Sequence, residues 1–221
     1  WGWCGMGAWL GGLVVDAVRV WRIPVAQPPT GVEAWLHALP PGEQTIGLRY
    51  RQTVDRTRAI AGRWWRRRLL SQVLGCAPDE LDFAETEAGK PQVASPEVGR
   101  SLQFNVSHSG DWVLLALSRG AAVGVDVERH RALDYHELAK SCFSAEEFST
   151  WSGLARVDRE TVFYDIWTRK EAYRKAPGLG LGTSLQEVSV PPTDEAGPVP
   201  VVSGARSDAA HLAALAPHGW P

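Results

Sequence analysis

The 221-residue chain is long enough for one large domain or two small ones, and its 44% hydrophobic and 22% charged residues are typical of a globular protein. The formal net charge of −2 indicates neither a nucleic acid nor an anionic membrane as partner, and no apolar run is long enough to span a bilayer. The three cysteines lie far apart without metal-ligand spacing, which argues against a disulfide framework or a zinc site and favours a cytoplasmic location.

Apolar periodicity and turn residues predict a first group of strands interrupted by a long helix. From the N-terminus, we expect a strand at 14–23, helices at 32–39 and 54–74, and strands at 81–86, 101–106, 112–118 and 121–128. Asp55 is the expected cap of the longer helix, and Gly75 is its expected end.

A second group follows the same plan. Residues 134–175 have a helical pattern, with a long helix expected to begin near Asp158 and to end before Pro177 and Gly178. Strands are expected at 185–190, 199–202 and 211–215. This order predicts an α+β protein in two halves, residues 1–122 and 123–221.

Two acids alternate with valines at residues 123–128. In a strand, Asp126 and Glu128 share one face, while the valines at 123, 125 and 127 share the other. Two carboxylates spaced in this way can share one hard cation such as Mg²⁺, which also prefers water and phosphate oxygens. The alternative is a half-buried strand with a solvated acidic face.

A third acid lies on the later helix. Phe163, Trp167, Glu171 and Lys175 recur every four residues, so an aromatic stripe ends in charged residues. A carboxylate on a stripe that faces the core is usually paired or bound to a metal. The alternative is a simple ion pair between Glu171 and Lys175 on the helix surface.

Residues 104–110, Phe-Asn-Val-Ser-His-Ser-Gly, end a strand in hydroxyl groups, an imidazole and a glycine. These groups and exposed backbone N–H groups are suitable anion donors. The alternative is an ordinary hairpin turn with His108 on the surface.

Other basic residues are candidates for binding an anion. Lys90 lies in a Gly-Lys-Pro turn, and Arg58 lies four residues before Gly62, a glycine that would let another group approach closely. The basic run at 63–68 is expected to be mostly a solvated face.

Taken together, four blocks in this order resemble the surfactin-synthetase-activating class of 4′-phosphopantetheinyl transferases. They are residues 89–91 (Gly-Lys-Pro), 104–109 (Phe-Asn-Val-Ser-His-Ser), 124–128 (Gly-Val-Asp-Val-Glu) and 167–172 (Trp-Thr-Arg-Lys-Glu-Ala), the last followed by Lys175. The resemblance implies two similar halves related by pseudo-twofold symmetry, with coenzyme A bound in the cleft between them. It also implies a monomer that modifies a serine of an apo acyl or peptidyl carrier protein, often in polyketide or nonribosomal peptide assembly, and releases adenosine 3′,5′-bisphosphate.

By position, the resemblance implies that Asp126, Glu128 and Glu171 hold Mg²⁺, or Mn²⁺, against the pyrophosphate of coenzyme A. Glu171 is also the candidate general base for the carrier serine. Lys175 would steady the pyrophosphate, with help from Lys170.

The resemblance also implies contacts to the rest of coenzyme A. Ser107, His108 and Arg58 would meet its phosphates, with His108 and Arg58 nearest the 3′-phosphate. Lys90 and its turn would border the adenine or its phosphate. Family members often carry cations before the first long helix, whereas residues 40–45 here contain none. The candidate substitutes for the missing cations are Arg49, Arg51 and Arg56.

Two alternatives to a transferase are a non-catalytic binder of coenzyme A or carrier protein, and a Mg²⁺-dependent pyrophosphate hydrolase.

Overall fold

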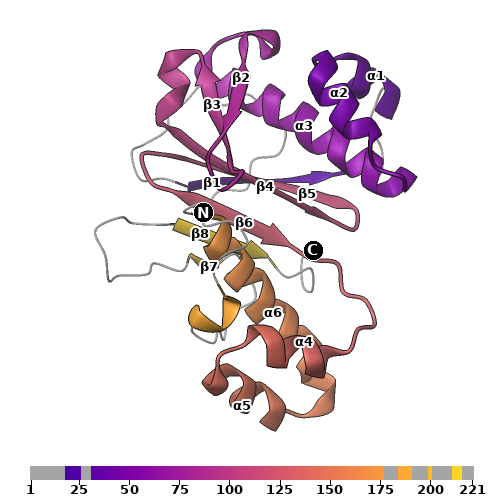
Figure 1. Ribbon diagram of the computed structural model, residues 1–221, viewed down its shortest axis with the longest axis vertical. Coiled ribbons are helices and arrows are strands. Elements are labelled where there is room, and N and C mark those ends of the chain that lie inside the picture. The colour runs from indigo at the N-terminus through magenta and orange to yellow at the C-terminus, as the bar shows by residue number, and fades with distance from the viewer. Residues whose placement is uncertain (1–17, 26–30, 177–183, 191–198, 201–210, 216–221) are drawn as a thin grey trace.

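The computed structural model describes residues 18–25, 31–176, 184–190, 199–200 and 211–215 (Figure 1). Helices and small sheets share the chain, which confirms the predicted mixture of α and β structure. Within the described residues, none of the helices is both long and apolar enough to cross a bilayer.

An antiparallel sheet in the order β1-β5-β4 lies at the centre of Figure 1. It is formed by β1 (Val18–Pro24), β4 (Leu102–Ser109) and β5 (Trp112–Arg119). Strands β4 and β5 form a hairpin, paired from Leu102 opposite Arg119 to Ser109 opposite Trp112. Gly110 turns the hairpin with a φ of 55°, a left-handed conformation that glycine adopts readily.

Helices cover one face of this sheet. They are α1 (Val32–His37), α2 (Pro41–Leu48) and α3 (Thr53–Leu74), shown in purple in Figure 1. Leu115 and Leu117 of β5 are buried in the same cluster as Ile60 and Leu70 of α3. Two further strands, β2 (Asp82–Glu85) and β3 (Pro91–Ser95), form a separate antiparallel pair.

The opposite face of the sheet packs on β6 (Val123–Val127). Leu114 and Ala116 alternate with the residues that face α3, and they are buried with the valines of β6. β6 pairs in parallel with β8 (His211–Leu215), which pairs antiparallel with β7 (Val199–Pro200). The β1-β5-β4 sheet and the fully buried strand β6 thus lie between the purple helices and the red and orange ones in Figure 1.

The part of the chain drawn from red to orange in Figure 1, residues 135–175, is mainly helical. It contains α4 (Tyr135–Cys142), α5 (Ala145–Gly153) and α6 (Arg156–Lys175), which share one aromatic core. Phe163 stacks on Trp167 with a centroid separation of 5.8 Å and on Phe143 with 5.6 Å. The aromatic end of the predicted stripe is therefore a packing surface.

Several local predictions need correction. The two expected caps, Asp55 and Asp158, lie within the first turns of α3 and α6 because those helices begin earlier; the N-cap positions are Gln52 and Ala155. Gly75 does end α3, with a φ of 69°. Residues 185–190 form no strand, because Leu185–Glu187 is a short 3₁₀ helix capped by the Ser184 side chain. The expected end of α6 at 177–178 lies outside the described residues.

Helix α2 was not predicted, and tertiary contacts explain its presence. Pro41 occupies a favourable first-turn position, but two glycines weaken the helix. Glu43 joins it to α3 through Arg66 at 3.1 Å and Arg67 at 2.6 Å. Arg66 also lies 3.9 Å above the Phe83 ring. These two arginines are therefore structural, and the prediction of a solvated basic face was wrong for them.

Candidate active site

The close approach of β6 to α6 is possible only because residue 124 is glycine. A Cβ added at Gly124 would lie 2.6 Å from the backbone nitrogen of Ala176 and closer still to the carbonyl oxygen of Ala172. Real Cβ atoms essentially never come this near to backbone atoms. The strand that carries Asp126 is thereby held directly against the helix that carries Lys175.

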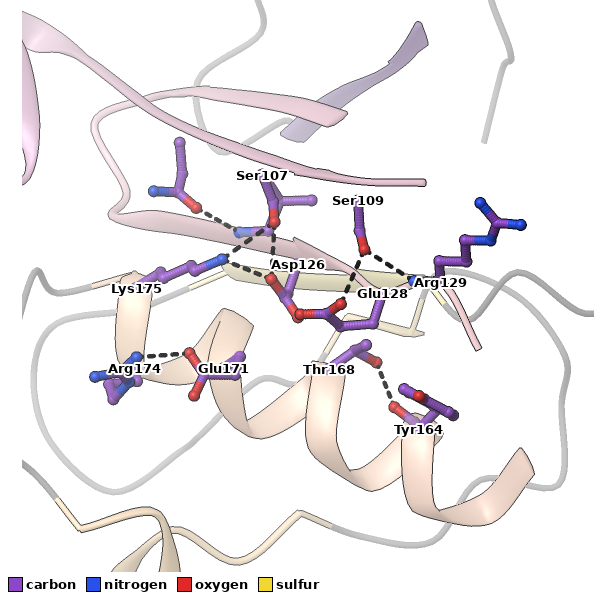
Figure 2. A network of polar contacts seen from close by, with 12 residues as sticks. Ser107, Ser109, Asp126, Glu128, Arg129, Tyr164, Thr168, Glu171, Arg174 and Lys175 are labelled. Atoms are coloured by element: carbon purple, nitrogen blue, oxygen red, sulfur yellow. Dashed lines mark hydrogen bonds and ion pairs between the residues drawn. The ribbon is translucent and has the colours of Figure 1, made fainter. Parts of the chain in front are cut away.

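Strand β4 supplies two hydroxyl groups to the two acids (Figure 2). Ser107 donates to Asp126 Oδ1 at 2.8 Å, and Ser109 donates to Glu128 Oε2 at 2.9 Å. Ser109 also accepts from the backbone N–H of Arg129 at 3.0 Å. The i, i+2 spacing on both strands produces these matched pairs, because alternate residues share a face.

Asp126 is the most deeply buried acid of the site, with 3% of its surface exposed. Lys175 Nζ lies 2.5 Å from Asp126 Oδ1 and 3.1 Å from the Ser107 hydroxyl. Burial raises the pKa of Asp126 to about 6, although Lys175 and Ser107 oppose this shift. The alternative of a solvated acidic face was therefore wrong for Asp126.

The second oxygen of Asp126 gives a direct test of whether the site fits a cation. Among the described residues, Oδ2 is buried without a hydrogen-bond partner, which is costly for a carboxylate. Figure 2 shows the Glu128 carboxylate beside that of Asp126, so a second oxygen ligand is at hand. A hard divalent cation would satisfy both groups. Asp126 of β6 and Glu128, directly after β6, thus fit the predicted metal.

The third predicted ligand is engaged elsewhere in this structure. Glu171 accepts from Arg174 at 2.7 Å, and its side chain is 12% exposed. The alternative of a Glu171–Lys175 pair was wrong, because Lys175 pairs with Asp126 instead. Over the ranges that the structure describes, no three His, Cys, Asp or Glu side chains are gathered into a metal site. The three-acid set therefore stays a prediction.

Lys170 does not lie at this site, so the prediction that it contacts coenzyme A was wrong. Its side chain is 0% exposed and lies 2.5 Å from Glu147 Oε2. The ammonium also donates to the carbonyl oxygens of Cys142 at 3.0 Å and Leu185 at 2.9 Å. These contacts join α4, α5 and α6, which makes Lys170 a core residue.

Cations lie near His108 at the end of β4, where Lys175 contacts the adjacent Ser107 and Arg58 contacts Gly110. Burial among the neighbouring elements lowers the pKa of His108, and the nearby charges of Lys175, Arg58 and Arg63 lower it further, although the residue still reaches solvent. Three cations beside an imidazole are suited to hold a phosphate. Sequence reasoning missed Arg63, because nothing in the basic run at 63–68 distinguishes it from its neighbours.

Arg58 is held in place before any ligand binds. Its Nε donates to the Gly110 carbonyl oxygen at 2.6 Å, and its Nη1 lies 2.8 Å from Asp55 Oδ1. Gly62 packs toward Val106, since a Cβ there would lie at an ordinary 3.7 Å from that side chain. Gly62 thus lies at a helix–strand contact.

Lys90 lies apart from the groups around His108. Its ammonium donates to the carbonyl oxygens of Val123 at 3.0 Å and Ala176 at 2.5 Å. The structure therefore places the side chain at the contact between β6 and α6, which the sequence did not predict.

Two family models match the chain. Residues 122–215 match the 4′-phosphopantetheinyl transferase superfamily, and residues 28–119 match the N-terminal model of 4′-phosphopantetheinyl transferase. A phosphopantetheinyl transferase from Thraustochytrium sp. is 36% identical over 205 residues, covering 82% of this chain and 68% of that protein. The 4′-phosphopantetheinyl transferase HetI of Nostoc sp. is 32% identical over 186 residues, covering 83% and 78%. Sfp of Bacillus subtilis is 28% identical over 158 residues, covering 72% and 68%.

Proposed function

This chain belongs to the 4′-phosphopantetheinyl transferase superfamily and transfers phosphopantetheine from coenzyme A to carrier proteins; we propose that the site around Asp126 carries out this reaction on a carrier serine. The observation that carries the proposal is the buried Asp126 carboxylate. One of its oxygens is bound to Lys175, and the other has no hydrogen-bond partner in the part of the chain that the structure describes. We assign the chain to the surfactin-synthetase-activating class on its four sequence blocks, and the 28% identity with Sfp is in keeping with that assignment.

The proposed metal ligands are Asp126, Glu128 and Glu171, which would hold Mg²⁺ or Mn²⁺ against the pyrophosphate of coenzyme A. The bound cation would supply positive charge to the pyrophosphate oxygens as the phosphorus–oxygen bond breaks. Glu171 must first leave Arg174, from which it is 2.7 Å away. The bound cation would then neutralise Glu171 in place of Arg174, so the exchange need not leave this acid unpaired.

Lys175 and Glu171 lie one helical turn apart on α6 and suit different parts of the transfer. In the reaction, the carrier serine oxygen bonds to the β-phosphorus, and the bond from that phosphorus to the bridging pyrophosphate oxygen breaks. Adenosine 3′,5′-bisphosphate leaves with the bond electrons. Lys175 would neutralise its developing charge, and Glu171 would accept the serine proton. Rigid anchoring on β6 and α6 orients these groups.

The cationic group around His108 is the proposed site for the 3′-phosphate. Arg58 and Arg63 of α3 bring two guanidinium groups to this end of β4, and guanidinium groups match phosphate geometry well. Ser107 is bound to Asp126 and Lys175, so it would meet the pyrophosphate rather than the 3′-phosphate. The contact of Lys90 with the adenine or its phosphate stays a prediction. The hydrogen bond of its ammonium to the Ala176 carbonyl oxygen does not favour it.

Two similar halves, residues 1–122 and 123–221, related by a pseudo-twofold axis are part of the proposal. Support comes from the pairing of one long helix with one three-stranded sheet in each, α3 in the first and α6 in the second. We also propose that the protein acts as a monomer on polyketide or nonribosomal peptide carriers, with coenzyme A between the halves.

The test is intact-protein mass spectrometry of apo acyl and peptidyl carrier proteins incubated with this protein, coenzyme A and Mg²⁺. A mass gain of one phosphopantetheine on the carrier serine supports the proposal. A parallel reaction without carrier detects cleavage of coenzyme A, which would indicate a hydrolase instead. Binding of coenzyme A with neither product would indicate a non-catalytic binder.

A further inference from the structure

Lys90 lies in a turn whose backbone is fixed by several hydrogen bonds. The Gly89 N–H donates to the Thr86 carbonyl oxygen at 2.8 Å, and the Lys90 N–H donates to the Thr86 hydroxyl at 3.0 Å. The Thr86 N–H donates back to the Lys90 carbonyl oxygen at 2.9 Å. Gly89 has a φ of 79°, which glycine permits. The direction in which Lys90 leaves the turn is therefore well defined.

From this turn the side chain reaches two segments that are distant in sequence. Val123 is the first residue of β6, and Ala176 is the C-cap of α6. The ammonium donates to the carbonyl oxygen of each, at 3.0 Å and 2.5 Å. One side chain from the turn between β2 and β3 thus bridges the strand that carries Asp126 and the helix that carries Lys175.

Both carbonyl oxygens benefit from a cationic donor. The last carbonyl groups of a helix have no partner within the helix, and they carry the negative end of its dipole. Ala176 directly follows Lys175, so a contact at Ala176 limits fraying of the turn that presents Lys175. Burial lowers the pKa of Lys90 to about 8, which still leaves the amine mostly protonated at pH 7.

A second polar contact fixes the same strand. The Asn105 side-chain oxygen accepts from the backbone N–H of Val125 at 3.0 Å. Lys90 thus holds β6 at the carbonyl oxygen of Val123, and Asn105 holds it at the N–H of Val125, two residues further on. Asp126 follows Val125 directly, so its position depends on both anchors.

We propose that Lys90 is a positioning residue, which acts on the transfer through β6 and α6 and does not touch coenzyme A. The expected effect on the transfer rate rests on the proposed function. The contact of Lys90 with Val123 and Ala176 does not, because it is present in the ligand-free protein. The role of the Gly-Lys-Pro turn is thus to hold Asp126 and Lys175 in position relative to each other.

The test compares Lys90→Met with wild type by hydrogen exchange without ligand, and by kinetics of carrier modification. Lys140→Met is the matched control, because Lys140 is exposed on α4. We expect faster exchange at residues 120–127 and 170–176 for Lys90→Met alone. A misplacement of about 1 Å can lower a rate by roughly 10²-fold, and the loss of one contact should shift the site by less, so we expect kcat to fall about tenfold. The Kd for coenzyme A should change less than about twofold.

A second variant guards against general unfolding. Lys90→Arg keeps the charge and donors, so it should restore much of the exchange protection and of kcat. Unchanged exchange in Lys90→Met together with a tenfold weaker Kd would overturn the proposal and make Lys90 a ligand contact. Faster exchange with unchanged kcat would also overturn it. Failure of wild type to modify any carrier would refute the proposed function, whereas the exchange result would still decide the contact.

Discussion

Gly124→Ala tests whether the contact between β6 and α6 sets both stability and activity. The new Cβ would lie 2.6 Å from the Ala176 nitrogen, and ordinary contact begins at 3.4 Å. Strand and helix must therefore separate by at least 0.8 Å at that point, and by more at the Ala172 carbonyl oxygen. The obstructing atoms are backbone atoms, so no side-chain rotation relieves the clash. Overpacking of this kind destabilises by about 1–3 kcal/mol.

The same displacement moves Lys175 away from Asp126; in wild type, Lys175 Nζ lies 2.5 Å from Asp126 Oδ1. A misplacement of about 1 Å can lower a rate by roughly 10²-fold, so we expect kcat to fall by about tenfold to a hundredfold. Urea unfolding measures the free energy of unfolding, and mass spectrometry of the carrier protein measures the rate.

Gly62→Ala is the matched control. Its Cβ would lie 3.7 Å from Val106, an ordinary contact, within helix α3. Replacing a helical glycine by alanine stabilises by up to about 1 kcal/mol, so this variant should be at least as stable as wild type. Wild-type stability and rate in Gly124→Ala would refute the close approach of β6 to α6.

Three further predictions concern the charged residues. Lys170→Met leaves Glu147 buried without its cation, so the free energy of unfolding measured by urea titration should fall by about 3–5 kcal/mol. A variant with wild-type stability that loses only coenzyme A affinity would contradict the assignment of Lys170 to the core. Arg58→Ala should weaken coenzyme A binding at least about tenfold more than dephospho-coenzyme A binding in calorimetry; equal losses would remove Arg58 from the 3′-phosphate site. Because the pKa of His108 is lowered, its ring is neutral at pH 7 and gains charge only as the pH falls. As the pH falls, the affinity of wild type for coenzyme A, measured without divalent cation, should therefore rise relative to that of His108→Ala; the same pH dependence in both proteins would contradict the role of His108.

The strand acids show how far sequence reasoning reaches. Alternation at 123–128 assigned Asp126 and Glu128 to one face, and their contacts with Ser107 and Ser109 agree with this. The burial of Asp126 was not predictable, because it depends on β4 and α6, which pack on β6 only in the folded protein. Local patterns give the direction of a side chain but not what covers it.

The lysines illustrate a different limit. Lys170 is next to Glu171 in sequence but about 100° away around the helix, and this rotation could have separated it from the site. Lys90 offered no such signal, because its partners are 33 and 86 residues away in the chain. Its turn could be recognised from Gly-Lys-Pro, whereas its contacts depend on how the two groups of elements pack together.

The central claim is that Asp126 and its neighbours hold a divalent cation together with coenzyme A. The most direct measurement is Mn²⁺ binding by electron paramagnetic resonance, with and without coenzyme A, in wild type and in Asp126→Asn. Because Glu171 and Asp126 are paired with Arg174 and Lys175 in this structure, we predict weak Mn²⁺ binding alone, much tighter binding with coenzyme A, and loss of that gain in Asp126→Asn. The same Mn²⁺ affinity in wild type and Asp126→Asn, with coenzyme A present, would contradict the account.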